Sequence, residues 1–432
     1  MIPIPRYQRR RAQLAKTMQC GIAVIPTADE KARNRDTQYP YRFDSHFYYL
    51  TGFMEPGAVA VVIAGKNPKT ILFCREKDLS REIWDGYRFG PNAAQKQFAF
   101  DEAYPIAKLD ELMPKLIAGQ PTLHYPLGAD TAWDARVFGW INQVKAQVRS
   151  GISAPAEIQD VRTLLDDMRL VKDADEIATM RRAADISSDA HRRAMQTTKP
   201  GMMEYQIEAE LLHEFRRRGA QAPAYTSIVA GGANGCVLHY VENNDPLKSG
   251  DLLLIDAGCE LDGYASDITR AFPVNGRFSA AQCDVYELVL AAQASAISAV
   301  KANASFENYH EVALKILVRG FIDLKLCKGS VDQVLESGDY KRFYMHRTGH
   351  WLGLDVHDAG DYKKQGKAVK LVPGMVVTVE PGCYIRPGKD VPKAFWNIGI
   401  RIEDDVLVTK TGRDILTHPP KTVRDIEHAM QG

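Results

Sequence analysis

The chain has 432 residues, which is long for one hydrophobic core and predicts two or three domains. Lys and Arg number 55 and Asp and Glu 54, so the formal net charge of +1 gives no reason to expect a nucleic acid or an anionic membrane as partner. Hydrophobic residues make up 45% and charged residues 25%, which is typical of a globular protein. No apolar run approaches the roughly 20 residues of a membrane-spanning helix.

The seven cysteines indicate a reducing compartment, because their number is odd and no two form a CxxC pair. We therefore expect a cytoplasmic protein without a disulfide scaffold or a structural zinc site. The N-terminal segment has no apolar core of a secretory signal, and it carries Arg6, Arg9, Arg10 and Arg11. We expect a basic surface helix there. A mitochondrial presequence is the alternative, although the segment is not Ser-rich.

The first third of the chain alternates strand-like and helix-like segments. Three β-branched, apolar runs lie at 21–25, 58–64 and 70–74, and helical stretches follow at 110–118 and 134–148. This alternation predicts an α/β domain. The composition changes over 150–173, where Gly, Pro and charged residues gather, and we place a domain boundary near residue 170. The predicted domains are 1–170 and 171–432.

The second part of the chain predicts helices first and strands afterwards. Ile177, Met180 and Ala184 form one helical stripe, and Ser279 with Gln282 forms a capping box at the start of a later helix. Helices followed by groups of strands indicate an α+β domain with a largely antiparallel sheet. The predicted strands are 252–257, 265–272, 375–380 and 398–408.

Two aspartates occupy positions where solvation does not explain them. Asp256 ends the apolar run 252–255, and Asp267 lies on the strand that follows a turn at Asp262-Gly263. If the two strands pair as a hairpin, both carboxylates can share one face. Two like charges that close need a cation, or one must take a proton. Either aspartate alone is better explained as a turn cap or a solvated group.

Acidic residues and histidines recur in the C-terminal half. His346, His350 and His357 fall within 12 positions, and Glu380 directly follows the apolar run 375–379. Each histidine by itself can be a packed interior residue, but the acidic residues at strand ends require an explanation.

The run 398–403 alternates with period two. Its isoleucines point one way, whereas Arg401 and Glu403 point the other way. Arg401 thus shares a face with Glu403 and can orient it, and an ordinary surface ion pair is the alternative explanation.

Two Asp, two Glu and one His from strands and loops suit a pair of divalent first-row ions. A structural zinc site would use Cys and His, and a calcium loop would cluster its ligands within a short segment. The chain has neither a GxSxG nucleophile elbow nor a GxxxxGK[ST] phosphate loop.

The order Asp256, Asp267, His350, Glu380, Glu403 resembles the five-ligand site of the pita-bread metallopeptidases. The strings HWLGLDVHD at 350–358, VEPGCYI at 379–385 and GIRIED at 399–404 are similar to those of the Xaa-Pro aminopeptidase (aminopeptidase P) family. The strings RNRDTQYPYR at 33–42 and YLTGFMEP at 49–56 resemble the N-terminal domain of the same enzymes. The resemblance therefore covers nearly the whole chain.

This resemblance implies a C-terminal pita-bread catalytic domain and an N-terminal creatinase-like α/β domain that serves oligomerisation and substrate access. It implies two divalent ions, with Mn²⁺ expected and Co²⁺ or Zn²⁺ as alternatives, and a hydroxide held between them that attacks the scissile carbonyl. Asp267 and Glu403 would bridge both ions, Asp256 would complete the shell of one ion, and His350 and Glu380 that of the other. The family's catalytic positions correspond to His239, His357, Glu380 and Arg401.

The implied substrates are peptides with proline in second position, and the implied assembly is a homo-oligomer, either a tetramer or a dimer. By resemblance, Asp36 would pair with the substrate's α-ammonium, and Trp84, Tyr225 and His346 would lie near the substrate. No nucleic acid or membrane is expected as partner.

Two other functions stay open at this stage. Prolidase, which cleaves only X-Pro dipeptides, shares the metal ligands, and only the N-terminal strings argue against it. A non-catalytic pita-bread binding protein is the alternative of a different class, and the intact set of ligands and histidines argues against it.

Overall fold

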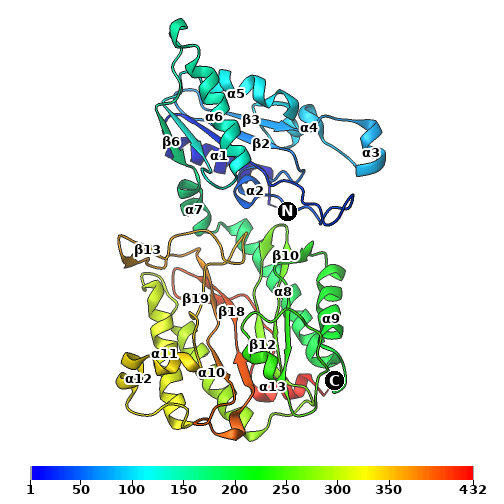
Figure 1. Cartoon of the computed structure of the whole chain (residues 1–432), viewed down its shortest axis with the longest axis vertical. Coiled ribbons are helices and arrows are strands. Elements are labelled where there is room, and N and C mark those ends of the chain that lie inside the picture. Colours follow the sequence, from blue (N-terminus) through cyan, green and yellow to red (C-terminus); the bar gives the residue numbers. More distant parts are fainter. Residues whose placement is uncertain (1, 432) are drawn as a thin grey trace. The chain divides into compact units, whose positions relative to one another are not determined.

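The computed structural model describes residues 2–431, and the chain divides into two compact units, Met1–Arg169 and Leu170–Gly432. Figure 1 shows the helices and strands of each unit. Within residues 2–431, no helix is both long enough and apolar enough to cross a lipid bilayer.

The first unit contains a six-stranded mixed sheet with the order β4-β3-β2-β1-β5-β6. The pairs β1–β2 and β2–β3 are antiparallel, and β3–β4, β1–β5 and β5–β6 are parallel. The strands are β1 (Ile22–Pro26), β2 (Val59–Ile63), β3 (Lys69–Cys74), β4 (Glu102–Pro105), β5 (Thr122–Tyr125) and β6 (Glu157–Asp160). The helices are α1 (Ile4–Met18), α2 (Ser45–Thr51), α3 (Leu79–Asp85), α4 (Gly90–Gln97), α5 (Leu109–Ile117), α6 (Thr131–Lys145) and α7 (Arg162–Leu170).

Helices α5 and α6 pack on this sheet because each has one apolar face. Met113 of α5 and Trp140 of α6 are buried together with Val24, Val61 and Phe73 of the central strands. The predicted strands and helices of this region are confirmed to within a few residues, and the domain is α/β as expected.

The N-terminal helix departs from the sequence prediction. We expected a basic surface helix, but Arg10 and Arg11 of α1 are 6% and 1% exposed. Arg11 donates hydrogen bonds to the carbonyl oxygens of Leu50 (2.9 Å), Phe98 (3.0 Å) and Ala99 (2.6 Å). The expectation of a surface position is wrong for these two residues, because a guanidinium has five donors and can be buried where carbonyl groups converge on it.

The second unit places helices on both sides of a group of strands, as Figure 1 shows. Helices α8 and α9 pack on one side, and α10 and α11 on the other. The capping box predicted for Ser279 and Gln282 is confirmed at the start of α10. The helices are α8 (Ala174–Thr197), α9 (Glu204–Arg217), α10 (Ala280–Ala299), α11 (Phe306–Asp323), α12 (Val331–Ser337) and α13 (Val423–Ala429).

The strand pairs described in the second unit are all antiparallel, which confirms the α+β prediction. They form separate small sheets, among them β12-β9-β8, β15-β18-β19 and β16-β17. The strands are β7 (Ala222–Pro223), β8 (Ile228–Gly231), β9 (Leu252–Asp256), β10 (Cys259–Leu261), β11 (Tyr264–Ala265), β12 (Thr269–Pro273), β13 (Lys363–Lys364), β14 (Lys367–Ala368), β15 (Val376–Val379), β16 (Gly382–Ile385), β17 (Ile398–Arg401), β18 (Asp404–Val408) and β19 (Arg413–Ile415).

Two segments predicted as single strands are interrupted in the structure. The segment 265–272 is divided into β11 and β12 with Asp267 in the break, and 398–408 is divided into β17 and β18 with Glu403 in the break. In each case the chain passes from one sheet to another. The interruption releases both carboxylates from regular strand geometry, and this is where the continuous-strand prediction is wrong.

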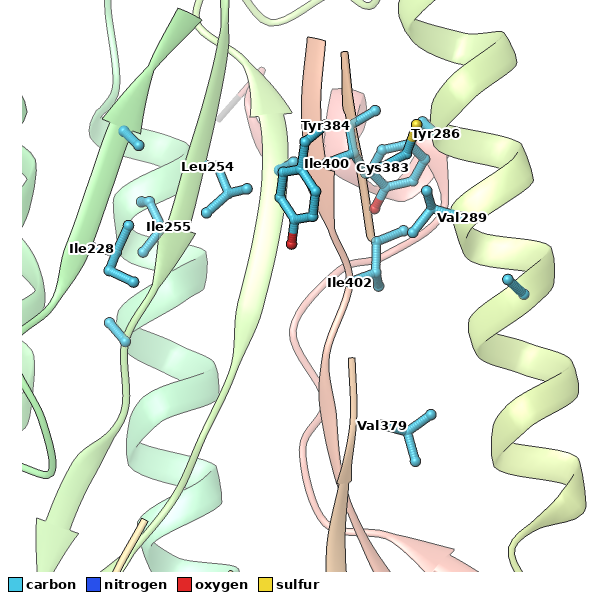
Figure 2. Packing of buried hydrophobic residues seen from close by; sticks show 14 of the residues in the cluster. Ile228, Leu254, Ile255, Tyr286, Val289, Val379, Cys383, Tyr384, Ile400 and Ile402 are labelled. Carbon is cyan, nitrogen blue, oxygen red and sulfur yellow. The ribbon is translucent and has the colours of Figure 1, made fainter. Parts of the chain in front are cut away.

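The core of the second unit lies between the strands and the helices. Figure 2 shows Cys383, Ile400 and Ile402 of the strand segments facing Tyr286 and Val289, which belong to α10. The isoleucines at 398, 400 and 402 are buried in this core, as the period-two pattern predicts. Burial of this face fixes the register that turns Arg401 and Glu403 to the opposite side.

Candidate metal centre

Five predicted metal ligands meet in one cavity of about 730 Å³ in the second unit. Asp256 ends β9, Asp267 precedes β12, Glu380 directly follows β15, and Glu403 lies between β17 and β18. His350 precedes the bridge that Trp351 makes with Val377 of β15. Strand ends and strand breaks therefore supply the ligands, which come from segments about 150 residues apart in the sequence.

Two glycines allow the backbone segments that carry the candidate ligands to lie close together. A Cβ on Gly349 would lie 2.0 Å from the carbonyl oxygen of Thr378, so only glycine lets the segment with His350 lie against β15. A Cβ on Gly258 would lie 1.8 Å from the carbonyl oxygen of Ser266, between the segments that carry Asp256 and Asp267. The site thus depends on backbone contacts at both positions.

The tightest group consists of Asp267, His350 and Glu403, whose ligand atoms all lie within 4.8 Å of one another. His350 Nε2 lies 3.5 Å from Asp267 Oδ2 and 3.7 Å from Glu380 Oε1. His350 Nδ1 lies 2.9 Å from the carbonyl oxygen of Trp351, which fixes the ring and leaves Nε2 directed at the carboxylates.

Asp256 is held by two neighbours on its other side. The Tyr225 hydroxyl lies 2.6 Å from Asp256 Oδ1 and 2.5 Å from Asp267 Oδ1. The Tyr225 hydroxyl has only one hydrogen and can donate it to only one of the two carboxylates at a time. The negative charges of Asp256 and Asp267 are therefore only partly compensated by this tyrosine. Arg401 Nη2 forms an ion pair with Asp256 Oδ2.

The carboxylates are perturbed by burial and by each other. Burial raises the pKa of Glu380 to about 7 against the opposing effects of His350 and Arg401. Burial, with the charges of Asp267 and Glu380, raises the pKa of Glu403 well above its usual range. For Asp267, burial acts upward, but the hydrogen bond and charge of His350, together with the hydrogen bonds to Tyr225 and Glu403, outweigh it and lower the pKa.

These shifts show that the cavity holds more negative charge than its own cations neutralise. Arg401 and His350 face four carboxylates, and a buried carboxylate without a partner is unfavourable. Oxygen donors with one imidazole are the donor set of hard and borderline divalent ions. The residues present therefore fit a pair of divalent metal ions.

Three further histidines predicted from the sequence line the same cavity. His239 and His357 are exposed, and the His357 ring centroid lies 4.2 Å from that of His350. His346 Nε2 lies 2.9 Å from the Tyr384 hydroxyl. Burial, and then the charge of Arg401, lowers the pKa of His346 to about 3, and burial lowers the pKa of His357. The imidazoles of His346 and His357 are therefore neutral at physiological pH and can each donate or accept a hydrogen bond.

The predicted orienting role of Arg401 has a structural basis through Thr269. Arg401 Nε donates to Thr269 Oγ1 (3.1 Å), and Thr269 Oγ1 donates to Glu403 Oε2 (2.7 Å). Arg401 Nη1 donates to the Tyr384 hydroxyl (2.9 Å). Sequence analysis assigned no role to Thr269 or Tyr384. Each residue places a polar side chain in a buried strand, and this unusual position was the sequence feature that could have identified it as part of the site.

Two predicted substrate residues belong to the first unit. Asp36 lies in an exposed turn, and Trp84 of α3 is 83% exposed. The residues that line the cavity all come from the second unit, and they include Tyr225 and His346. The roles of Asp36 and Trp84 stay predictions.

Comparisons with known protein families agree with this division of the chain. Residues 178–410 match the model of metallopeptidase family M24, and residues 7–124 match that of the aminopeptidase P N-terminal domain. The chain is 43% identical over 433 residues to the Xaa-Pro aminopeptidase of Haemophilus influenzae, with 99% of this chain and 98% of the relative covered.

Solved structures show the same fold along the full length. The aminopeptidase PepP of Pseudomonas aeruginosa has a TM-score of 0.98 at 48% identity and covers 100% of this chain and 98% of its own. A zinc-substituted aminopeptidase P of Escherichia coli in complex with product has a TM-score of 0.97 at 42% identity, and the match covers 100% of this chain and 98% of that protein. The pita-bread fold with a creatinase-like N-terminal domain, expected from the sequence, is confirmed.

Proposed function

The chain belongs to metallopeptidase family M24, and from that premise we propose that it is a Xaa-Pro aminopeptidase, which removes the first residue from peptides with proline in second position. The observation that carries the proposal is the match over both units to proteins of that name, together with a cavity that contains all five predicted ligands and both predicted catalytic histidines.

We propose that Asp256, Asp267, His350, Glu380 and Glu403 hold two divalent ions, with Mn²⁺ expected and Co²⁺ or Zn²⁺ as alternatives. Two bound metal ions would supply a hydroxide near neutral pH, because coordination to a metal lowers the pKa of water. In this assignment Asp267 and Glu403 are the bridging ligands, a role that their proximity supports.

The chain's own groups then act on the substrate. His239 and His357 are exposed on the cavity wall and can donate hydrogen bonds to the scissile carbonyl oxygen as negative charge develops on it. Glu380 accepts a proton on a carboxylate oxygen and passes it to the departing proline nitrogen. Arg401 holds Asp256 and, through Thr269, Glu403.

Selectivity for proline has a physical basis. The bond before proline is a tertiary amide without an N–H, and the ring fixes φ, so a site that needs neither an N–H donor nor a flexible residue accepts it. Apolar side chains form one part of the cavity wall and offer a surface for the ring: Ile228, Leu238, Val241, Phe306 and Val356. Asp36 would pair with the α-ammonium of the substrate, which would restrict cleavage to the first bond, and Trp84, Tyr225 and His346 would border the substrate.

The decisive assay is incubation of Mn²⁺-loaded protein with Ala-Pro-Ala, with Ala-Ala-Ala as control. Release of free Ala from the first peptide alone is expected. Cleavage of the dipeptide Ala-Pro but not of Ala-Pro-Ala would instead establish prolidase activity. No cleavage of either peptide, with no binding of Mn²⁺, Co²⁺ or Zn²⁺ at micromolar concentration, would establish a non-catalytic binding protein.

We further propose a homo-oligomer, a dimer or a tetramer, in which the first unit makes contacts. Helix α3 has no buried residue, and it exposes 72% of Leu79, 83% of Ile83 and 83% of Trp84. Adjacent apolar side chains with this exposure mark a surface for association. Ile83→Glu is expected to shift the sedimentation coefficient towards the monomer. An unchanged oligomer in that variant would place the interface elsewhere.

A further inference from the structure

The two carboxylates assigned as bridging ligands lie in different sheets. Asp267 precedes β12, which pairs with β9, whereas Glu403 precedes β18, which pairs with β15 and β19. The distance between the two carboxylates is therefore set by contacts between the sheets. Three hydrogen bonds connect the two segments directly: Glu403 N donates to the carbonyl oxygen of Thr269 (3.1 Å), Thr269 Oγ1 donates to Glu403 Oε2 (2.7 Å), and Asp267 N donates to Asp405 Oδ2 (3.2 Å).

Arg270 lies at this junction and contacts both segments. Its Nη1 donates to the carbonyl oxygen of Glu403 (2.6 Å) and to the carbonyl oxygen of Thr269 (2.9 Å). Its Nη2 forms an ion pair with Asp404 Oδ1 (2.7 Å), and both side chains are 0% exposed. A single guanidinium thus binds the backbone immediately beside each of the two bridging segments. It does not line the substrate cavity.

Asp404 is fixed in turn from several directions. Its Oδ2 accepts hydrogen bonds from Gln293 (2.8 Å) and Lys421 (2.7 Å), and its Oδ1 accepts one from Thr417 (2.8 Å). These partners come from α10 and from the segments that follow β19. Because Asp404 is satisfied on both oxygens, it forms a rigid support for the guanidinium.

We infer that Arg270, supported by Asp404, is a positioning residue that sets the separation of Asp267 and Glu403 and thereby the affinity of the protein for divalent ions. The inference rests on the ligand set of the proposed function. Arginine is required because its planar fork reaches four carbonyl oxygens, including those of Pro419 and Pro420, and a carboxylate at once, whereas lysine offers a point charge on a flexible stem.

The test measures Mn²⁺ binding to metal-free protein by calorimetry for Arg270→Lys and Asp404→Asn. Loss of a partner that orients metal ligands weakens metal binding about 10–100-fold, and both variants are expected to fall in that range. At saturating Mn²⁺ we expect a lower kcat for Ala-Pro-Ala with KM unchanged, because neither side chain lines the cavity. Phe215→Leu is the matched control, since Phe215 is a buried residue of α9 outside this network.

The control is expected to lower the unfolding temperature and leave the Mn²⁺ affinity unchanged. Wild-type affinity in folded Arg270→Lys and Asp404→Asn would overturn the inference, as would an equal loss of affinity in Phe215→Leu at the same unfolding temperature. If Arg270→Lys does not fold, the Mn²⁺ affinity of Asp404→Asn alone tests the inference, because this substitution preserves the size of the side chain. Wild-type protein that binds no divalent ion would overturn the proposed function itself.

Discussion

The two units bury charge of opposite sign. Within residues 2–169, the buried residues with a permanent charge are Arg10, Arg11 and Arg169. In the second unit, acidic residues outnumber basic ones among the buried charged groups, and two of them, Asp267 and Glu403, line the cavity. The arginines Arg10 and Arg11 contact carbonyl oxygens and aromatic rings, whereas the carboxylates of the cavity mainly face one another.

This difference separates structural burial of charge from burial that serves a ligand. A guanidinium surrounded by carbonyl oxygens has its hydrogen bonds satisfied by the protein alone. A cluster of carboxylates with too few cations is satisfied only when cations bind. The contrast predicts that removing a charge has opposite consequences for stability in the two units.

The largest effect is expected for Glu403→Ala, which removes a bridging ligand. Turnover of Ala-Pro-Ala should fall by more than about 100-fold, because loss of an orienting partner alone weakens metal binding by about that factor. In metal-free protein, the isosteric Glu403→Gln should raise the unfolding temperature, since it relieves repulsion among buried carboxylates. The exposed Glu336→Ala is the control. Near-normal turnover in Glu403→Ala would refute the bridging assignment.

A smaller loss of activity is expected for His357→Ala. It should lower kcat by about 100-fold, the effect of removing one donor to a developing oxyanion. Metal content, measured by elemental analysis, should change little, because His357 is outside the predicted ligand set. His213→Ala, an exposed histidine of α9, should leave kcat unchanged. A loss of bound metal that parallels the loss of kcat would assign His357 to the metal site instead.

In the first unit, Arg11→Met should reduce stability and leave the chemistry intact. It removes three hydrogen bonds to buried carbonyl oxygens, which we expect to lower the free energy of unfolding by about 3 kcal/mol in denaturant titrations. The exposed Arg9→Met on the same helix is the matched control. Equal stability of the two variants would contradict the structural role assigned to buried arginine.

The smallest effect concerns acid stability. His191 is fully buried, its Nε2 lies 2.9 Å from the carbonyl oxygen of Ala257, and burial lowers its pKa to about 4. The folded state therefore keeps His191 neutral, so its contribution is complete above pH 6.5 and is lost as the pH falls towards 4. At pH 5 this linkage amounts to about 2 kcal/mol. His191→Gln should flatten the stability profile between pH 6.5 and 4, and an unchanged slope would exclude His191 as its source.

The sequence predicted the elements where local pattern and burial agree. The period-two run at 398–402 placed its isoleucines in the core and Arg401 on the other face, because a strand has only two faces. The capping box at Ser279 could also be predicted, because it involves residues only three positions apart in the sequence. The strand breaks at Asp267 and Glu403 could not be predicted, since they depend on which sheet each segment joins. The burial of Arg10 and Arg11 likewise depends on carbonyl groups 39 to 88 residues away.

The amino-acid sequence by itself determined the α+β character of the second unit and the identities of the five candidate ligands. Residue types and their spacing suffice for both, because a carboxylate at the end of an apolar strand is anomalous wherever that strand lies. Only the tertiary structure decided how these ligands are held. Tyr225 between two aspartates, Thr269 between Arg401 and Glu403, and Arg270 across two sheets are contacts between distant segments. They exist because separate sheets pack together, and no local pattern encodes that packing.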